Sequence, residues 1–235
     1  GRLNALDITA LVLLFAFLLG FLYIIWIYIK GLQGSPYELY LLFFTKVTEY
    51  SAYGAANLAF MFYLREDLGF TDITAGSCMA AWSISMTFIM MAVGAVCDAL
   101  GVKKTLIIGA VALMLSRSVM PLTNDVWMAT ILGFVPLAFG IAITGPVLSV
   151  GIKYFTTKEG AALGFGLFYT LMNVGWAIGA WLFDHVRSLI GDTGAVAFMG
   201  NNLSVYQVII GIGFFITLPD FVAILLMRDG VKMTE

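Results

Sequence analysis

The chain has 235 residues, of which 61% are hydrophobic and only 11% are charged, and its formal net charge is −2. Soluble domains carry about 25% charged residues, so this composition excludes a soluble globular protein and indicates an integral membrane protein. No run of Lys and Arg interleaves with aromatic residues, which argues against a nucleic-acid partner. The single histidine, His185, and the two cysteines, Cys78 and Cys97, form no group with metal-ligand spacing, so no metal or other cofactor is expected.

The first apolar run, Ile8–Ile29, ends at Lys30 and is long enough to span a membrane. A cleaved signal peptide is the alternative, but the run exceeds an apolar signal region of about 7–15 residues, and no small-residue cleavage site follows it. A linker rich in glycine and proline, residues 31–36, comes next. Residues 1–36 are therefore predicted to be an extra N-terminal transmembrane helix with its linker, and residues 37–235 a separate helical bundle.

Six further apolar runs follow, each near the roughly 20 residues that cross a bilayer core as a helix. They are Tyr37–Leu64, Ile73–Val96, Lys104–Leu122, Val126–Phe155, Ala161–Phe183 and Val205–Met227. Pro136 and Pro146 predict a kink in the fourth of these runs. The polar loop 184–202 is long enough to carry a small ordered turn. The sequence thus predicts an all-α integral membrane protein with seven transmembrane helices.

If the seven spans cross the membrane in alternating directions, most of the 12 Lys and Arg residues fall on one side of it. Seven fall on one side: Lys30, Lys103, Lys104, Lys153, Lys158, Arg228 and Lys232. Three fall on the other side, Arg2, Arg65 and Arg187, while Lys46 and Arg117 lie inside spans. The positive-inside rule predicts that the side with seven basic residues is cytoplasmic, with the first short tail outside and the final tail inside.

A short polar stretch between two of the spans carries a family pattern. Gly94, Asp98, Gly101, Lys103 and Lys104 resemble the G-x-x-x-D-x-x-G-[RK]-[RK] signature of the major facilitator superfamily, which lies between the second and third helices of that family. The departure is Val102, which stands where the family more often has a basic residue directly after the second glycine. In physical terms, Gly94 allows a close helix contact, Gly101 a tight reversal, and the lysines a cytoplasmic turn. An ordinary short loop with a basic flank is the alternative interpretation.

The resemblance implies that residues 37–235 are the N-terminal six-helix half of a secondary transporter. Within the family, two stretches are similar to the proton-coupled oligopeptide branch: 140–157, with Pro146 and Lys153-Tyr154, and 165–175, with Phe165-Gly166-Leu167-Phe168-Tyr169 and Asn173-Val174-Gly175. A different frame would make the extra helix the sixth span of a twelve-helix protein and the rest its C-terminal half. The signature turn and Tyr53-Gly54 favour the N-terminal assignment.

The first bundle helix departs from that branch, which carries E-x-x-E-R-F-x-Y-Y-G. When the last two residues of this motif are aligned with Tyr53-Gly54, the chain has Thr45 and Thr48 in place of the two carboxylates and Glu49 in place of the arginine. The branch's proton-coupling groups and its peptide substrate therefore do not carry over.

Charged and polar residues inside the spans are the candidate site. Lys46, Glu49, Tyr53 and Asn57 fall within an arc of about 80° on one helix, which predicts either one wall of a central cavity or a Lys46–Glu49 pair that neutralises itself. Tyr169, Asn173 and Trp176 form a second candidate cavity stripe, with interhelical hydrogen-bond packing as the alternative.

Two more intramembrane charges, Arg117 and Asp220, have no opposite charge within one turn of their own helices. Arg117 is expected to extend toward the nearby membrane surface. Asp220 is expected to contact Arg117 or Lys46 across helices, or to be protonated.

Three classes of function follow from these residues. The first is one half of a secondary transporter with a midplane cavity, whose partners are the lipid bilayer, a second six-helix half and a small-molecule substrate. The second is a transporter-derived structural subunit of a larger membrane complex, bound to other membrane subunits. An enzyme is disfavoured, because the sequence has no phosphate-binding glycine loop and no nucleophile with a base at catalytic spacing.

Overall fold

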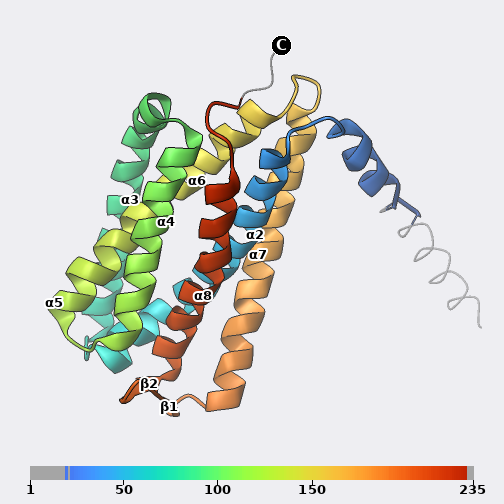
Figure 1. Ribbon diagram of the computed structural model, residues 1–235. Helices are drawn as coiled ribbons and strands as arrows, with labels where there is room; N and C mark the ends of the chain where they lie inside the picture. Colours follow the sequence, from blue (N-terminus) through green and yellow to red (C-terminus); the bar gives the residue numbers. More distant parts are fainter. Residues whose placement is uncertain (1–18, 21, 232–235) are drawn as a thin grey trace, which may run out of the picture.

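The computed structural model describes residues 19–20 and 22–231, and these fold mainly into long helices that run side by side (Figure 1). The helices of the bundle are α2 (Tyr37–Phe62), α3 (Asp72–Leu100), α4 (Val102–Val119), α5 (Val126–Met128), α6 (Val135–Phe155), α7 (Ala161–Ile190) and α8 (Val205–Leu226). Short irregular helices connect them: the π-helical segments η1 (Tyr63–Asp67) and η3 (Ala129–Phe134), and the 3-10 turn η2 (Met120–Leu122). Two antiparallel strands, β1 (Ala195–Phe198) and β2 (Asn201–Ser204), form a hairpin between α7 and α8.

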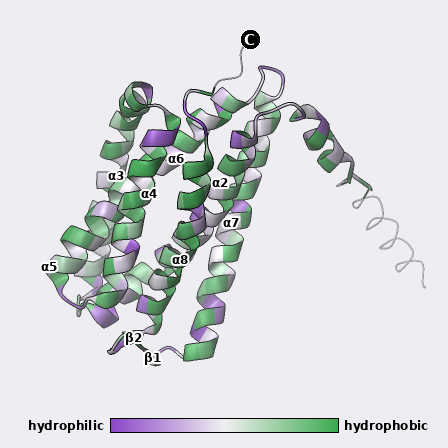
Figure 2. Ribbon diagram, in the orientation of Figure 1, coloured by the Kyte–Doolittle hydropathy of each residue, from purple (hydrophilic) through white to green (hydrophobic). Residues whose placement is uncertain are grey.

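Five helical segments of the described chain are long and apolar enough to cross a membrane. They are Asp72–Leu100, Val102–Leu122, Val126–Phe155, Ala161–Ile190 and Val205–Leu226. The helix α2 is also 26 residues long, but it carries Glu38, Lys46 and Glu49. Hydrophobic residues dominate the helices, while hydrophilic ones gather at the ends and connections (Figure 2). The predicted fold class, an all-α multi-pass membrane protein, is confirmed.

The first predicted span lies mostly outside the described residues. Within them, Leu22–Gly31 is a short apolar helix that leads away from the bundle (Figure 1). Its C-terminal end approaches α7, because Tyr28 lies beside Gly166 and Gly31 lies beside Leu163. The assignment of residues 1–36 as a separate membrane helix remains a prediction.

Close helix contacts build the core of the bundle. The helix α2 packs against α7 and α8, α6 packs against α3 and α4, and α4 also packs against α8. Gly175 and Gly179 of α7 face the backbone of α2, where a Cβ on Gly179 would lie 2.7 Å from the Ser51 carbonyl oxygen. At one end of the bundle, the Arg228 side chain donates two hydrogen bonds to Glu38, at 2.6 and 3.0 Å, and so connects the end of α8 to the start of α2.

The elements that carry the predicted cytoplasmic charges meet at one end of the bundle. The α3–α4 turn, the α6–α7 loop and the end of α8 all lie there, opposite the β-hairpin (Figure 1). Lys103, Lys104 and Arg228 border the same surface hollow at this end. In the described part of the chain, the basic residues predicted to be cytoplasmic therefore lie at one end of the bundle, as the predicted alternation of the spans requires.

Two helices end later than predicted. The helix α3 continues past Val96 to Leu100, so that Gly101 alone joins it to α4, with φ 84° and ψ 163°, a region open almost only to glycine. The helix α7 continues past Phe183 to Ile190 before Gly191 ends it at φ 84°. Polar side chains on one face had suggested a loop there, but a long helix tolerates them where that face is exposed.

The π-helical segment η3 (Ala129–Phe134) interrupts the fourth bundle span two residues before Pro136, one of the two prolines from which a kink is predicted. Proline lacks the N–H that an α-helix needs in its interior, and a locally wider turn relieves the clash of its ring with the preceding turn. Pro146 lies inside α6.

Candidate functional site: a buried charge network

An ion pair between α2 and α4 lies at the centre of the bundle. Arg117 donates two hydrogen bonds to the two carboxylate oxygens of Glu49, each at 2.8 Å, in a parallel bidentate arrangement. It also donates to the Thr217 hydroxyl of α8. The Arg117 side chain is only 1% exposed. In hydrocarbon, each such charge costs about 2.5–3.5 kcal/mol on insertion scales, and the pairing offsets much of that cost.

A glycine in α8 leaves room for the guanidinium group. A Cβ on Gly213 would lie 3.3 Å from Cδ and 3.4 Å from Nε of Arg117. Thr217, one turn later in α8, donates its own hydroxyl hydrogen to the Gly213 carbonyl at 2.7 Å, so its oxygen faces Arg117 as an acceptor. The three helices α2, α4 and α8 thus each supply one part of this site.

A second buried carboxylate lies one turn further along α8. Asp220 accepts a hydrogen bond from the Thr48 hydroxyl through Oδ1. Its other oxygen, Oδ2, has no hydrogen-bond partner within the described chain, and neither do the nearby buried Thr45 hydroxyl of α2 and Nε of Arg117. Orphaned buried polar atoms are rare in folded proteins and mark places where a proton, an ion or a water molecule is bound.

Lys46 has aromatic neighbours. Its ammonium nitrogen lies 3.8 Å from the ring centroid of Tyr50 and 3.9 Å from that of Phe168 on α7. A cation that is desolvated between two ring faces gains about 2 kcal/mol or more from their quadrupoles. The network as a whole holds two basic and two acidic side chains, Lys46, Arg117, Glu49 and Asp220, all of them buried.

Two sequence interpretations of these charges are wrong. Glu49 pairs with Arg117 across helices, so the predicted Lys46–Glu49 pair within one helix does not form. Arg117 points into the bundle and does not extend to the membrane surface. Spacing along one helix cannot show which helices become neighbours, and a bidentate contact between helices outcompetes a single contact within one. Thr48 and Thr217, which complete the network, were not candidates, although each lies one turn or less from a charged residue on its own helix.

The other candidate cavity residues lie beside this network. Trp176 packs edge-on against Tyr53, with ring centroids 5.2 Å apart, and so joins the two predicted stripes. Asn57 is half-buried, whereas Tyr169 and Asn173 are exposed on α7, where Asn173 donates to the Tyr169 carbonyl at 3.1 Å. A cavity of about 10 Å³ lies beside Glu49 and Tyr53, at the lower limit for one water molecule.

The signature residues lie at the charged end of the bundle. Asp98 is exposed and makes no ion pair or hydrogen bond with the described chain. Lys104 is exposed and Lys103 is half-buried. A Cβ on Gly94 would meet nothing within 4 Å, so the close helix approach predicted there is not made inside this bundle. The turn residue Gly101 is the one whose backbone conformation the structure explains directly.

These features define a multi-pass membrane protein of the transporter type, with a charge network buried among its helices. The family comparison agrees: residues 42–233 match the Major Facilitator Superfamily, and the chain belongs to that family. No curated protein matches the chain closely enough to count as a relative. The family match does not distinguish between branches of the superfamily.

Proposed function

We propose that this chain forms one half of a secondary transporter, whose substrate path near the bilayer midplane is completed by a second six-helix half. The observation that carries this proposal is the face that α7 turns away from the bundle. A strip of that face is small and polar rather than lipid-like, and it is made by the exposed residues Thr170, Asn173, Ala177 and Asp184. Small and polar residues on a membrane helix favour a protein neighbour, because backbones can approach closely and polar groups find partners.

A matching stripe lies on α3. Gly76, Ala80, Ser83, Thr87, Gly94 and Asp98 recur at three-, four- and seven-residue spacing, and all are exposed. A Cβ on Gly76 or Gly94 would meet nothing within 4 Å, so this side of α3 has open space beside it. The helices α3 and α7 are also the least buried of the five apolar spans in the described chain. The α3 stripe suits a contact with a second half, and the α7 strip suits a water-filled path between the two halves.

The buried network supplies the chemistry that coupled transport needs. Asp220 offers a free carboxylate oxygen beside Thr48 and Thr45, while Glu49 is held by Arg117. A proton or a small cation that neutralised Asp220 would change the charge balance at the centre of the bundle, and helices that share buried charges respond to such a change. Within the superfamily we propose the oligopeptide branch as the nearest pattern, without the proton-coupling carboxylates that Thr45 and Thr48 replace.

The test is the water accessibility of the polar face of α7 in native membranes. In a chain with Cys78→Ala and Cys97→Ala, the single variants Asn173→Cys and Ile178→Cys are exposed to a charged, water-soluble methanethiosulfonate. Ile178 lies on the apolar flank of the same helix, about 140° around from Asn173, and is the matched control. Thiolates form only where water reaches, so we expect Asn173→Cys to react at least about tenfold faster than Ile178→Cys.

Two outcomes contradict the proposal. Equal rates at the two positions would show that the face of Asn173 lines no aqueous path. Reaction of Asn173→Cys only after purification away from other membrane proteins would show that a partner covers the face permanently. The second result would support the alternative, a structural subunit of a larger membrane complex.

A further inference from the structure

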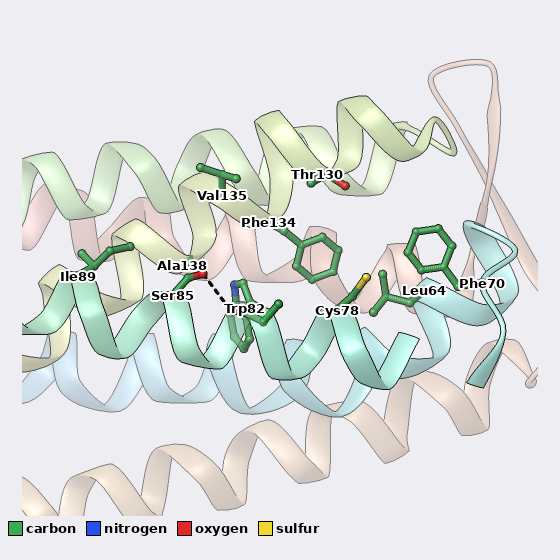
Figure 3. Close-up of a pocket in the computed structure, with 11 residues that line it drawn as sticks. Leu64, Phe70, Cys78, Trp82, Ser85, Ile89, Thr130, Phe134, Val135 and Ala138 are labelled. Atoms are coloured by element: carbon green, nitrogen blue, oxygen red, sulfur yellow. Dashed lines mark hydrogen bonds between the residues drawn. The ribbon is translucent and has the colours of Figure 1, made fainter. Parts of the chain in front are cut away.

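A surface pocket of about 330 Å³ lies between α3 and the η3–α6 segment (Figure 3). Its walls are largely apolar, and they include Leu64, Phe70, Cys78, Ile89 and Phe134. Exposed side chains such as Val135 border it, so a molecule can enter from the surface of the bundle. This volume is at the lower end of the range of about 300–1,000 Å³ that is typical of small-molecule sites.

One polar group in this pocket has no partner. The indole N–H of Trp82 is buried and donates to no acceptor within the described chain. In Figure 3 the nitrogen lies on the side of the ring that faces Ala138 and the η3–α6 segment. The one hydroxyl nearby in this view, that of Ser85, donates to the Ala81 carbonyl at 2.8 Å. The ring itself is fixed by Phe60, whose centroid lies 5.4 Å away in an edge-on contact.

The depth of Trp82 makes this orphaned donor costly. Trp82 comes ten residues after Asp72, the first residue of α3, so it lies about 15 Å along the helix from that end. A bilayer core is about 30 Å thick, which places the indole near its middle, where water does not supply an acceptor. A ligand with an acceptor at that point would satisfy the N–H.

The stripe of α3 that we propose as the contact with the second six-helix half does not include the residues that line this pocket. Ser83 belongs to the small-residue stripe of α3, whereas Ala81 and Ser85, two residues before and after it, line the pocket. Two residues correspond to about 200° of helix rotation, so the pocket and the stripe lie on different sides of α3. The pocket therefore stays available whether or not a second half is present.

We propose that this pocket binds a small apolar molecule that carries one hydrogen-bond acceptor, such as a carbonyl oxygen, which receives the Trp82 N–H. The apolar walls take up the body of the ligand through burial of its surface, and the indole fixes its orientation. Molecules of the same shape without the acceptor bind more weakly, because they leave the donor unpaired. This inference concerns binding and holds independently of transport.

Cys78 provides a direct readout, because its half-buried thiol lines the pocket, whereas Cys97 is buried elsewhere in the bundle. The full chain in native membranes is treated with N-ethylmaleimide, and mass spectrometry gives the alkylation of each cysteine. The probes are benzophenone, an apolar ketone, and diphenylmethane, which has the same two rings and no acceptor. We expect benzophenone to protect Cys78 at a concentration about tenfold lower than diphenylmethane does.

Two variants separate recognition from folding. In Trp82→Phe, the two compounds should protect Cys78 equally, at the concentration that diphenylmethane requires in the unmodified chain. In Ala81→Leu, the larger side chain fills the pocket from its edge, and neither compound should protect. Cys97 stays unreactive in every variant that keeps the fold. Equal protection by both compounds in the unmodified chain would overturn the proposal. Where the bilayer keeps water, and therefore the thiolate, away from Cys78, the same comparison is made with the chain extracted into detergent.

Discussion

At the scale of single residues, the Glu49–Arg117 pair decides how the charges of this bundle are accommodated. Both side chains are buried, and each contributes two atoms to the bidentate contact. Removing one partner leaves the other as an uncompensated charge in a low-dielectric interior, whereas removing both leaves none. The stability of the bundle should therefore depend on the pair rather than on either residue.

We expect Glu49→Gln and Arg117→Met each to lower the free energy of unfolding by about 3–5 kcal/mol, and the double variant to lose much less than the sum. Thermal unfolding of the purified chain in detergent measures this coupling. The control is Lys46→Met combined with Glu49→Gln, because Lys46 packs on Tyr50 and Phe168 instead of Glu49. Equal coupling in both cycles would contradict the assignment of the partner.

A second residue-scale prediction concerns pH and the Asp192 carboxyl, which lies outside the membrane spans. Arg187 donates two hydrogen bonds to Asp192, at 2.6 and 2.9 Å, which lowers the pKa of the Asp192 carboxyl from its ordinary 3.8. Because the folded pKa is the lower one, the pair stabilises the fold fully above pH 3.8 and loses its effect as the pH falls through the folded pKa.

The unfolding temperature of Asp192→Asn should accordingly lie slightly below that of the unmodified chain at pH 6 and converge with it at acidic pH. The effect is small, since this pair is exposed to water. A difference that grows on acidification would contradict the assignment.

At the scale of helices, the contact between α2 and α7 depends on glycines. A Cβ on Gly179 would lie 2.7 Å from the Ser51 carbonyl oxygen and 2.8 Å from the Ala55 nitrogen, both of them backbone atoms that cannot move alone. The two helices approach so closely that Trp176 reaches Tyr53 and Phe168 reaches Lys46. The geometry around Lys46 thus depends on a packing contact between backbones.

We expect Gly179→Ala to separate α7 from α2 and to lower stability by about 1–3 kcal/mol. Gly94→Ala is the matched control, since it also places a methyl group on a glycine inside a membrane helix, but into open space. In the isolated chain, Gly94→Ala should be neutral or slightly stabilising, because alanine favours the helix. Thermal unfolding of both variants decides the point, and equal losses would count against the close contact.

At the scale of the whole molecule, the signature residue Asp98 faces outward at the charged end and has no partner inside the described chain. It lies on the same stripe of α3 as Gly94 and Thr87, which we assign to the second half. A carboxylate at a membrane surface with free acceptor oxygens suits a helix end or a basic residue of a partner.

Asp98→Ala should therefore lower the amount of intact assembly extracted from native membranes, while the thermal stability of the isolated chain stays unchanged. Native gel electrophoresis measures the assembly. Val96→Ala, a change at an exposed apolar residue about 200° around the same helix from Asp98, is the control and should leave the assembly intact. Unchanged assembly in Asp98→Ala would remove this residue from the interface.

Sequence alone determined the membrane class, the position of the helices and the family. Those features depend on local properties: apolar runs of bilayer length, the basic residues at their ends, and the spacing of Gly94, Asp98 and Gly101. Boundaries were less accurate at the polar end of α7, because an exposed helical turn and a loop can have the same composition.

Only the tertiary structure decided which buried groups meet. Arg117 and Glu49 are 68 residues apart, and Asp220 lies 172 residues from Thr48, so no spacing in the sequence pairs them. The partner of a buried charge depends on which helices become neighbours, and that choice depends on close contacts such as those at Gly179 and Gly213. The same holds for the unpaired N–H of Trp82, because the lack of a partner becomes visible only when every neighbour is in place.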